Sequence, residues 1–184
     1  FDLVESIKEH GVLTPATIRK KEDGRYEMLS GHRRKRACEK AGLDTIRCEV
    51  VEMDRDSACI FMVDSNLQRE SLLPSEKAKA YKMKMEALNR QGNRTDLTSC
   101  KVGTKFRTDE LIAENSGESA RTIQRYIRLI NLIPPLLKLV DDGIVKQSIA
   151  HELSFLEEVE QYDLLETMES EDCTPSLSQA QQMK

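Results

Sequence analysis

The spacing of the apolar residues changes once along this chain of 184 residues, and that change limits the possible folds. In the first third, three short segments have the composition of β-strands, at 16–20, 26–30 and 45–52. Asp23-Gly24, between the first two segments, is a strong signal for a hairpin turn. Beyond these segments the apolar residues recur at helical spacing. The sequence therefore predicts an α+β fold, in which a small α/β unit is followed by an all-α part.

Glycine, proline and aspartate mark the ends of the predicted helices. Gly11 ends a first helix, and Gly31 and Gly42 enclose a second, basic one. Asp54 and Pro74 stand where two further helices begin. The expected parts are a first domain, a polar linker without steady periodicity and a helical domain, over residues 1–90, 91–107 and 108–184.

Composition excludes several classes of protein. Trp is absent and aromatic residues make up only 4%, which favours an aliphatic, helix-rich interior over a β-sandwich. No apolar run is long enough to span a bilayer, so we expect no membrane partner. The five cysteines include no CxxC pair, which argues against a disulfide framework or a zinc site and favours a reducing cytoplasm. The chain begins with Phe1, so we expect a piece of a longer protein.

The net charge of −4 is spread unevenly along the chain. From residue 140 onward there are eleven acidic residues and two lysines, so residues 1–139 carry a net charge of +5. A basic body with an acidic C-terminal part fits a protein whose first part contacts phosphates. The acidic part would repel a polyanion, so we expect the binding surface to lie elsewhere.

The most specific local pattern lies within residues 109–129. Ala113, Gly117 and Ile123 stand where a helix-turn-helix needs a small residue, a turn glycine and a buried aliphatic residue. The second helix would begin with a capping serine and present polar and basic side chains to a DNA major groove. The alternative is an ordinary helical hairpin with a solvated basic face. The candidate DNA-binding residues are Ser119, Arg121, Thr122, Gln124, Arg125 and Arg128.

A second pattern is a basic glycine loop. Gly31 follows a predicted strand and opens a helix, and His32, Arg33 and Arg34 come directly after it. Backbone N–H groups at a helix N-terminus favour an anion, and paired arginines donate to phosphate oxygens. The polar segment 64–70, at the end of an apolar helix, would form the opposite wall of one phosphate pocket. The alternative is a basic surface helix and a plain helix end.

Three ordered segments resemble the motifs of the ParB family of chromosome and plasmid partition proteins, across nearly the whole chain. Residues 6–19 are similar to the family's first box, 31–42 to its GERRxRA motif, and 66–78 to its ENxQRxxLxPxEEA motif. A helix-turn-helix follows at the expected distance. The first domain also resembles sulfiredoxin, but the reactive cysteine between glycine and histidine is missing from Gly31-His32.

The resemblance implies a CTP-dependent DNA clamp. Such a homodimer recognises a centromere-like site, closes and slides when CTP binds, and is moved by a ParA-type ATPase in the bacterial cytoplasm, on the nucleoid or a plasmid. Asn66 would help to place Mg²⁺. No separate dimerisation domain is evident before Lys184, so we expect stable dimerisation to need further chain. The residues implied around the nucleotide are Gly11, Thr14, Pro15, Gly31, His32, Arg33, Arg34, Asn66 and Arg69.

The chain departs from the family motifs at three positions. His32 replaces the glutamate of GERR, Ser65 replaces the glutamate before asparagine, and Thr14 stands where many members have glutamine. A neutral hydroxyl binds Mg²⁺ more weakly than a carboxylate does. We therefore expect nucleotide contact to persist, with CTP hydrolysis weak or absent. Two other functions stay open: a transcriptional repressor without CTP switching, and a nuclease or nucleotide hydrolase built on the first domain.

Overall fold

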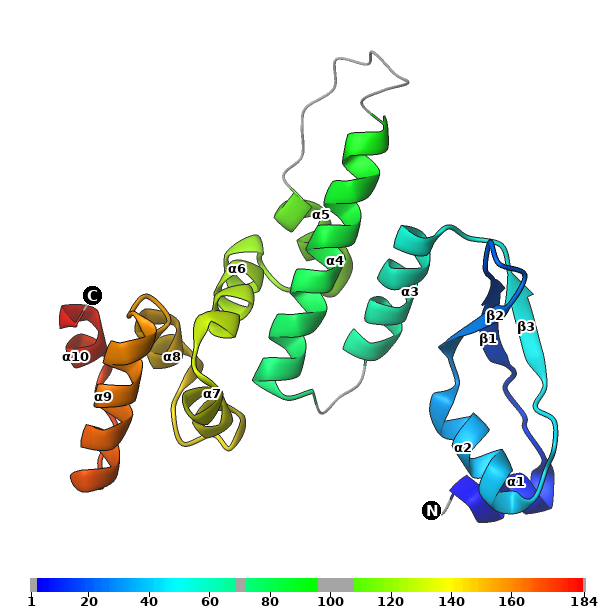
Figure 1. Ribbon diagram of the computed structural model, residues 1–184, viewed down its shortest axis with the longest axis horizontal. Helices are drawn as coiled ribbons and strands as arrows, with labels where there is room; N and C mark the ends of the chain where they lie inside the picture. Colours follow the sequence, from blue (N-terminus) through cyan, green and yellow to red (C-terminus); the bar gives the residue numbers. More distant parts are fainter. Residues whose placement is uncertain (1–2, 69–71, 96–107, 184) are drawn as a thin grey trace. The chain divides into compact units, whose positions relative to one another are not determined.

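The computed structural model describes residues 3–68, 72–95 and 108–183. It has the predicted α+β fold, in which a small three-stranded sheet is followed by helices (Figure 1). The chain divides into two compact units, Phe1–Ser65 and Asn66–Lys184. The sheet belongs to the first unit, and the predicted helix-turn-helix belongs to the second.

The sheet consists of β1 (Ala16–Lys20), β2 (Tyr26–Ser30) and β3 (Cys48–Val51), in the order β2-β1-β3. β1 pairs antiparallel with β2 and parallel with β3. β1 and β2 have the predicted bounds, because Gly24 takes up φ +80° in the hairpin turn between them. β3 is shorter than the predicted 45–52, because it pairs only with the first four residues of β1.

Helices α1 (Leu3–His10) and α2 (His32–Ala41) pack together at one end of the sheet (Figure 1). Ile7 of α1 and Ala37 and Cys38 of α2 form a small buried cluster there. The other face of α2 carries its basic side chains and stays exposed. The helix that follows the loop glycine is therefore anchored by its apolar side, and its charged side chains other than Arg34 are exposed.

Two polar contacts stabilise the first unit. α3 (Arg55–Leu67) begins after Asp54, as predicted, and the Asp54 carboxylate accepts a hydrogen bond of 2.8 Å from the Ser57 backbone N–H. The buried Arg19 of β1 donates through Nε to Glu27 Oε2 on β2 at 2.7 Å, and its Nη2 forms an ion pair with the same oxygen at 2.7 Å. Because these two residues are cross-strand partners, the ion pair matches the strand register.

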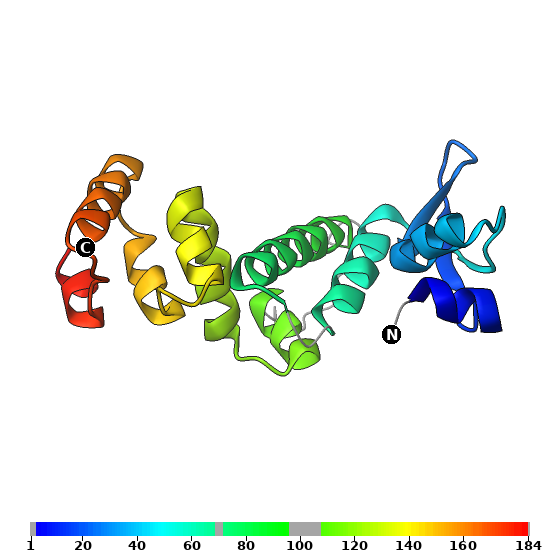
Figure 2. The same ribbon diagram turned by 90° about the horizontal axis from the view of Figure 1, so that it is seen from below.

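The second unit is entirely helical over its described residues beyond α3. Helices α5 and α6 lie alongside the long α4 (Figures 1 and 2). The helices that follow, drawn from yellow to red in Figure 2, pack around a second apolar core. The elements are α4 (Pro74–Thr95), α5 (Thr108–Ser116), α6 (Ala120–Arg128), the 3₁₀ helix η1 (Leu129–Asn131), α7 (Pro134–Asp141), α8 (Gln147–Leu153), α9 (Glu158–Ser170) and α10 (Leu177–Gln182).

Polar contacts join these helices over long sequence distances. The Asp141 carboxylate at the end of α7 accepts a hydrogen bond of 2.9 Å from the Ser75 backbone N–H at the start of α4. Gln161 of α9 is fully buried; its Oε1 accepts from the Ile133 N–H at 2.9 Å, and its Nε2 donates to the Asn131 carbonyl at 3.1 Å. α7 is thereby tied to α4 at one end and to α9 at the other.

The structure moves the expected boundaries between parts. α4 continues to Thr95, past the predicted helix end at residue 90, and the remainder of the expected linker, 96–107, lies outside the described residues. The compact units divide between Ser65 and Asn66, because α4 packs against α5 and α6. Among the described helices, none is long and apolar enough to cross a membrane.

Candidate functional site

Helices α5 and α6 form a helix-turn-helix. Gly117 adopts φ +70° in the turn, a left-handed conformation that glycine takes up without steric cost, and its N–H donates to the Ala113 carbonyl at 3.2 Å. Ile112 and Ile123 are fully buried and pack with Tyr81 of α4. Gly117 and Ile123 therefore have the predicted structural roles, and Ala113 is partly buried against the same cluster. α4 supplies the surface against which both helices pack.

The serine before α6 caps the helix. Ser119 has extended backbone angles, and its Oγ accepts a hydrogen bond of 3.1 Å from the Thr122 N–H. The two hydroxyl groups, Ser119 Oγ and Thr122 Oγ1, lie 2.8 Å apart. Both side chains thus make local contacts that fix the start of the helix.

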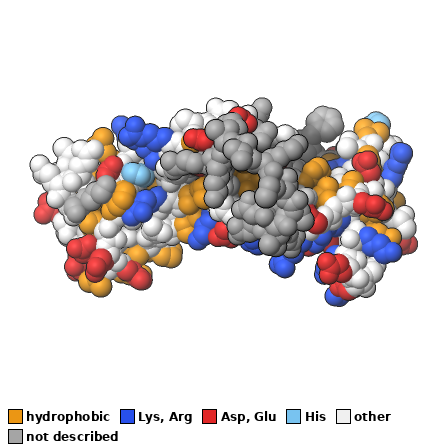
Figure 3. Space-filling view, turned by 90° about the horizontal axis from the view of Figure 1, so that it is seen from above, with side chains coloured by type: hydrophobic (Ala, Val, Ile, Leu, Met, Phe, Trp, Pro, Cys, Tyr) orange, Lys and Arg blue, Asp and Glu red, His pale blue; other side chains and the backbone are white. Residues whose placement is uncertain are grey.

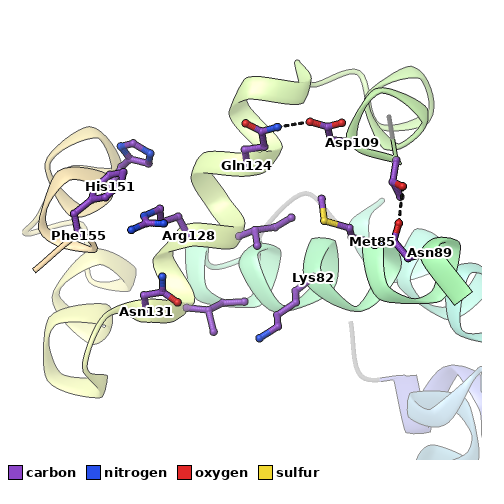
Figure 4. Close-up of a pocket in the computed structure, with 12 residues that line it drawn as sticks. Lys82, Met85, Asn89, Asp109, Gln124, Arg128, Asn131, His151 and Phe155 are labelled. Atoms are coloured by element: carbon purple, nitrogen blue, oxygen red, sulfur yellow. Dashed lines mark hydrogen bonds between the residues drawn. The ribbon is translucent and has the colours of Figure 1, made fainter. Parts of the chain in front are cut away.

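The remaining DNA-binding candidates divide into two pairs. Arg121 and Arg125 are exposed and form no ion pair with any described residue. Gln124 and Arg128 instead contact neighbouring elements (Figure 4). The Gln124 amide donates to the Asp109 carboxylate, and the Arg128 guanidinium lies over the Phe155 ring with Cζ 3.6 Å from the ring centroid. Arg121 and Arg125 are therefore the most accessible basic groups on α6.

An ion pair braces the turn of the helix-turn-helix against α4. Lys77 Nζ lies 3.1 Å from Glu118 Oε1 and 5.3 Å from the centroid of the Tyr126 ring. Burial lowers the pKa of Lys77, but the hydrogen bond to Glu118 and nearby negative charge outweigh it and hold this pKa above its ordinary value. Burial raises the pKa of the neighbouring Tyr81 hydroxyl, which therefore stays protonated. The position of the turn depends on this ion pair as well as on apolar packing.

Acidic side chains are concentrated in the C-terminal part of the chain. Eleven of them lie beyond residue 139, and Glu158 and Glu160 stand in the first turn of α9. In the space-filling view, acidic side chains gather at the end of the second unit that holds this helix (Figure 3). That the acidic part lies outside a phosphate-binding surface stays a prediction.

In the first unit, the basic glycine loop forms the N-terminus of α2. Gly31 adopts φ +103° and ψ 12° at the N-cap, and no side chain caps the helix. A Cβ atom on this residue would lie 2.7 Å from Ala16 Cβ, so only glycine fits between α2 and β1. The first backbone N–H groups of α2 are therefore without a side-chain acceptor and suit an anion.

Arg34 connects the glycine loop to the segment before β1. Its Nη1 donates to the carbonyls of Thr14 and Pro15, at 2.7 Å for Pro15. His32 and Arg33, by contrast, are exposed. Four of the predicted nucleotide-binding residues therefore lie together: Thr14, Pro15, Gly31 and Arg34. Nη1 of Arg34 holds the loop that contains Thr14 and Pro15.

The other predicted nucleotide-binding residues lie in separate segments of the chain. Gly11 adopts φ +71° at the end of α1, where its N–H donates to the Ile7 carbonyl at 2.9 Å. Asn66 lies in the last turn of α3 and begins the second unit, and Arg69 lies outside the described residues. The participation of Asn66 and Arg69 in a common nucleotide site stays a prediction.

The donor groups fit an anionic ligand better than a metal ion. The free N–H groups of α2 and the exposed Arg33 match the charge of a triphosphate. Next to Asn66, the side chain of Ser65 offers Mg²⁺ a neutral oxygen instead of a carboxylate. Within the described residues, no group of three or more His, Cys, Asp or Glu side chains is arranged to hold a metal.

Comparison with known proteins identifies the first unit. Residues 1–67 match the sequence model of the ParB N-terminal domain. The chain is 33% identical over 157 residues, 85% of its length, to the probable chromosome-partitioning protein ParB of Pseudomonas putida. It is 32% identical over 157 residues to the chromosome-partitioning protein Spo0J of Thermus thermophilus. The chain belongs to the ParB family.

The resemblance to the ParB family extends to both units of the fold. The C-terminally truncated ParB of Caulobacter crescentus, solved in complex with the centromeric parS site, matches 98% of this chain and 85% of its own with a TM-score of 0.59 and 24% identity. Against the two sequence relatives, this chain spans 48% and 51% of their lengths, about half of each. The family assignment therefore rests on the N-terminal domain and on the sequence similarity to about half of each partition protein.

Sequence reasoning missed several residues that contact the helix-turn-helix. Asp109 holds the Gln124 side chain, Phe155 holds Arg128, and Lys77 binds Glu118 of the turn. Each contact joins residues at least 15 positions apart, beyond the reach of helical periodicity. The capping position of Ser119, by contrast, was predicted because its signal is local.

Proposed function

We propose that this chain is the DNA-binding and nucleotide-binding part of a ParB-type partition protein, with α6 as the helix that enters the major groove of a centromere-like site. The observation that carries this proposal is the exposure of Arg121 and Arg125. Both are exposed and form no ion pair with a described residue, on a helix whose opposite face holds the fully buried Ile123. Exposed arginines on a firmly packed helix suit guanine edges and phosphates.

The geometry also supports distinct roles for the other α6 candidates. Ser119 and Thr122 would set the start of the helix, where backbone N–H groups can meet a phosphate. Gln124 would read a base only after leaving Asp109, so its contribution to sequence preference would be smaller than that of Arg125. These roles are supported by the contacts each side chain already makes.

The nucleotide part of the proposal is CTP binding at the N-terminus of α2. The free N–H groups after Gly31 and the guanidinium of Arg33 would bind the phosphates. Arg34 would hold the Thr14-Pro15 loop in shape and offer its remaining donors to the same phosphates. His32 and Gly11 would border this loop, and bound CTP would supply the charge that draws these groups together.

Asn66 in the last turn of α3 would complete the nucleotide site together with Arg69, and Asn66 would help to place Mg²⁺. Because Ser65 provides no carboxylate, hydrolysis would be weak or absent. The assembled protein would act as a homodimer with a ParA-type ATPase in the bacterial cytoplasm, bound to the nucleoid or to a plasmid. The parS-bound relative and the partition proteins of similar sequence support this role.

A second candidate is a transcriptional repressor that uses the same helix-turn-helix without CTP. The presence of His32 and Ser65 in place of family glutamates favours it. The two functions differ in a direct test. The test uses DNA duplexes that this chain selects from a random pool. A repressor would bind them equally with and without CTP. A partition clamp would bind CTP, and added CTP would change its site-bound complex into a closed complex that slides along DNA.

Arg34→Lys sharpens the nucleotide half of that test. In Arg34 one nitrogen, Nη1, donates to the carbonyls of both Thr14 and Pro15, which leaves Nε and Nη2 for phosphate oxygens. Lysine keeps the positive charge but has a single nitrogen, so it cannot hold the loop and also offer a second group to the phosphates. We expect CTP affinity, measured by calorimetry, to fall at least about tenfold. Lys35→Arg on the exposed face of α2 is the matched control. Unchanged affinity in Arg34→Lys would contradict a site at this loop.

A further inference from the structure

A hollow of about 660 Å³ lies within the second unit beside α6 (Figure 4). It is bounded by α4, by the C-terminal end of α6, by α8 and by Phe155, which follows α8. Lys82 of α4 and Arg128 of α6 bring positive charges to its walls. The buried Asp109 binds Gln124, and the His151 ring of α8 has its Nδ1 3.3 Å from Glu152 Oε1. The lining is therefore rich in donors for an anion.

Arg128 is held in this hollow in an unusual way for a half-buried arginine. Its guanidinium lies over the face of Phe155, with Cζ 3.6 Å from the ring centroid. The ring is in turn packed edge-on with His151, at 5.3 Å between centroids and an interplanar angle of 81°. Among the described residues, no carboxylate pairs with Arg128, and its buried Nε has no hydrogen-bond partner. The positive charge is oriented by an aromatic face and is not neutralised.

This arrangement suits a group that must meet an external anion. A carboxylate partner would occupy the guanidinium donors and cancel its charge, whereas an aromatic face fixes the plane of the group and leaves its edge available. The N-terminal residues of a recognition helix contact base edges, and Arg128 is the last residue of α6. A group at that end is placed for the sugar-phosphate backbone.

We infer that Phe155 is a positioning residue, which holds Arg128 so that its guanidinium binds a phosphate of the DNA backbone beside the recognition helix. The inference rests on the proposed DNA-binding function and adds to it a phosphate contact outside the exposed arginines of α6. Phe155 itself touches no DNA. It acts by fixing the orientation of Arg128, and His151 supports the ring from its edge.

The test is the salt dependence of binding to a random-sequence DNA duplex, which reports phosphate contacts without requiring the cognate site. Loss of one contact lowers the slope of log affinity against log salt by about 0.9, or about eightfold in affinity near 0.1 M salt. We expect Arg128→Gln to show this full loss and Phe155→Leu to show part of it. Phe155→Tyr, which keeps the aromatic face, should bind like the wild-type chain.

Two further measurements separate positioning from folding. Phe61→Leu, on an exposed phenylalanine of the first unit, is the matched control and should leave the slope unchanged. In the double variant Arg128→Gln, Phe155→Leu, the loss should equal that of Arg128→Gln alone, because Phe155 acts only through Arg128. Thermal unfolding of each variant checks that the second unit is folded; if Phe155→Leu lowers its stability, Phe155→Tyr and Arg128→Gln still decide.

The outcomes distinguish this inference from the proposed function. If the wild-type chain binds neither random nor selected duplexes, the proposed DNA-binding function fails. If the wild-type chain binds and Arg128→Gln leaves the salt slope unchanged, the phosphate contact is wrong and the function stands. If Arg128→Gln lowers the slope but Phe155→Leu with intact folding does not, the positioning role of Phe155 is wrong.

Discussion

Gly31→Ala should destabilise the first unit by more than a change of backbone preference alone. At φ +103° an alanine is strained, at a cost of about 1–2 kcal/mol. Its Cβ would also lie 2.7 Å from Ala16 Cβ, so β1 or α2 must shift, and overpacking of this kind costs about 1–3 kcal/mol. The expected total is about 2–5 kcal/mol.

Gly24→Ala is the matched control for this prediction. Gly24 has φ +80° in the hairpin turn, and a Cβ there meets nothing within 4 Å. Its cost should be the backbone term alone, about 1–2 kcal/mol, and the effect of alanine on the unfolded chain is shared by both variants. The difference between the two variants therefore isolates the contact with Ala16.

Native-state hydrogen exchange of the β1 and α2 amides is the appropriate assay, because it reports the unfolding free energy of this unit without interference from the helical one. We expect Gly31→Ala to lose at least about 1 kcal/mol more than Gly24→Ala. Equal losses in the two variants would refute the argument that Gly31 is required by the close approach of α2 and β1. CTP binding should be lost in Gly31→Ala and retained in Gly24→Ala.

Three further predictions concern the second unit. Arg125→Ala should weaken binding to a selected duplex by about 1–3 kcal/mol and relax base preference at one position, as measured by competition with single-base variants; an unchanged preference would exclude base contact. Gln161→Leu leaves the Ile133 N–H and the Asn131 carbonyl without partners and should cost about 2–5 kcal/mol in urea unfolding, so a cost under about 1 kcal/mol would contradict the network. Because the pKa of Lys77 is raised on folding, its ion pair stabilises the protein below the ordinary lysine pKa of 10.5 and loses this contribution as pH rises through the folded value. The stability difference between wild type and Lys77→Met should therefore stay constant near neutral pH and shrink above about pH 10.5; a difference that grows there would contradict this sign.

Much of the fold could be predicted from the sequence because its signals are local. Asp23-Gly24 set the hairpin, Asp54 and Ser119 set helix starts, and Gly117 set the turn between α5 and α6. Each of these residues acts on backbone groups within four positions of itself. The spacing of residue types indicates such local contacts, so they can be predicted without a structure.

The rest depended on contacts between distant residues. Nothing near Arg34 in the sequence indicates that its guanidinium binds carbonyls 19 and 20 positions earlier. The pairing of Arg128 with Phe155 is equally long-range, and helical periodicity alone marks Phe155 as core. The continuation of α4 to Thr95 was missed because the polar residues there give no apolar period, although they continue a helix that is already formed.

We propose that this ParB-family chain couples DNA binding to a CTP site at the N-terminus of α2. Calorimetric titration with CTP, ATP, GTP and UTP, each with Mg²⁺ and with a selected duplex present or absent, tests it most directly. We expect CTP alone of the four nucleotides to bind. Absence of binding by every nucleotide, with DNA present as well as without it, would contradict the claim and leave a helix-turn-helix DNA-binding protein without a nucleotide switch.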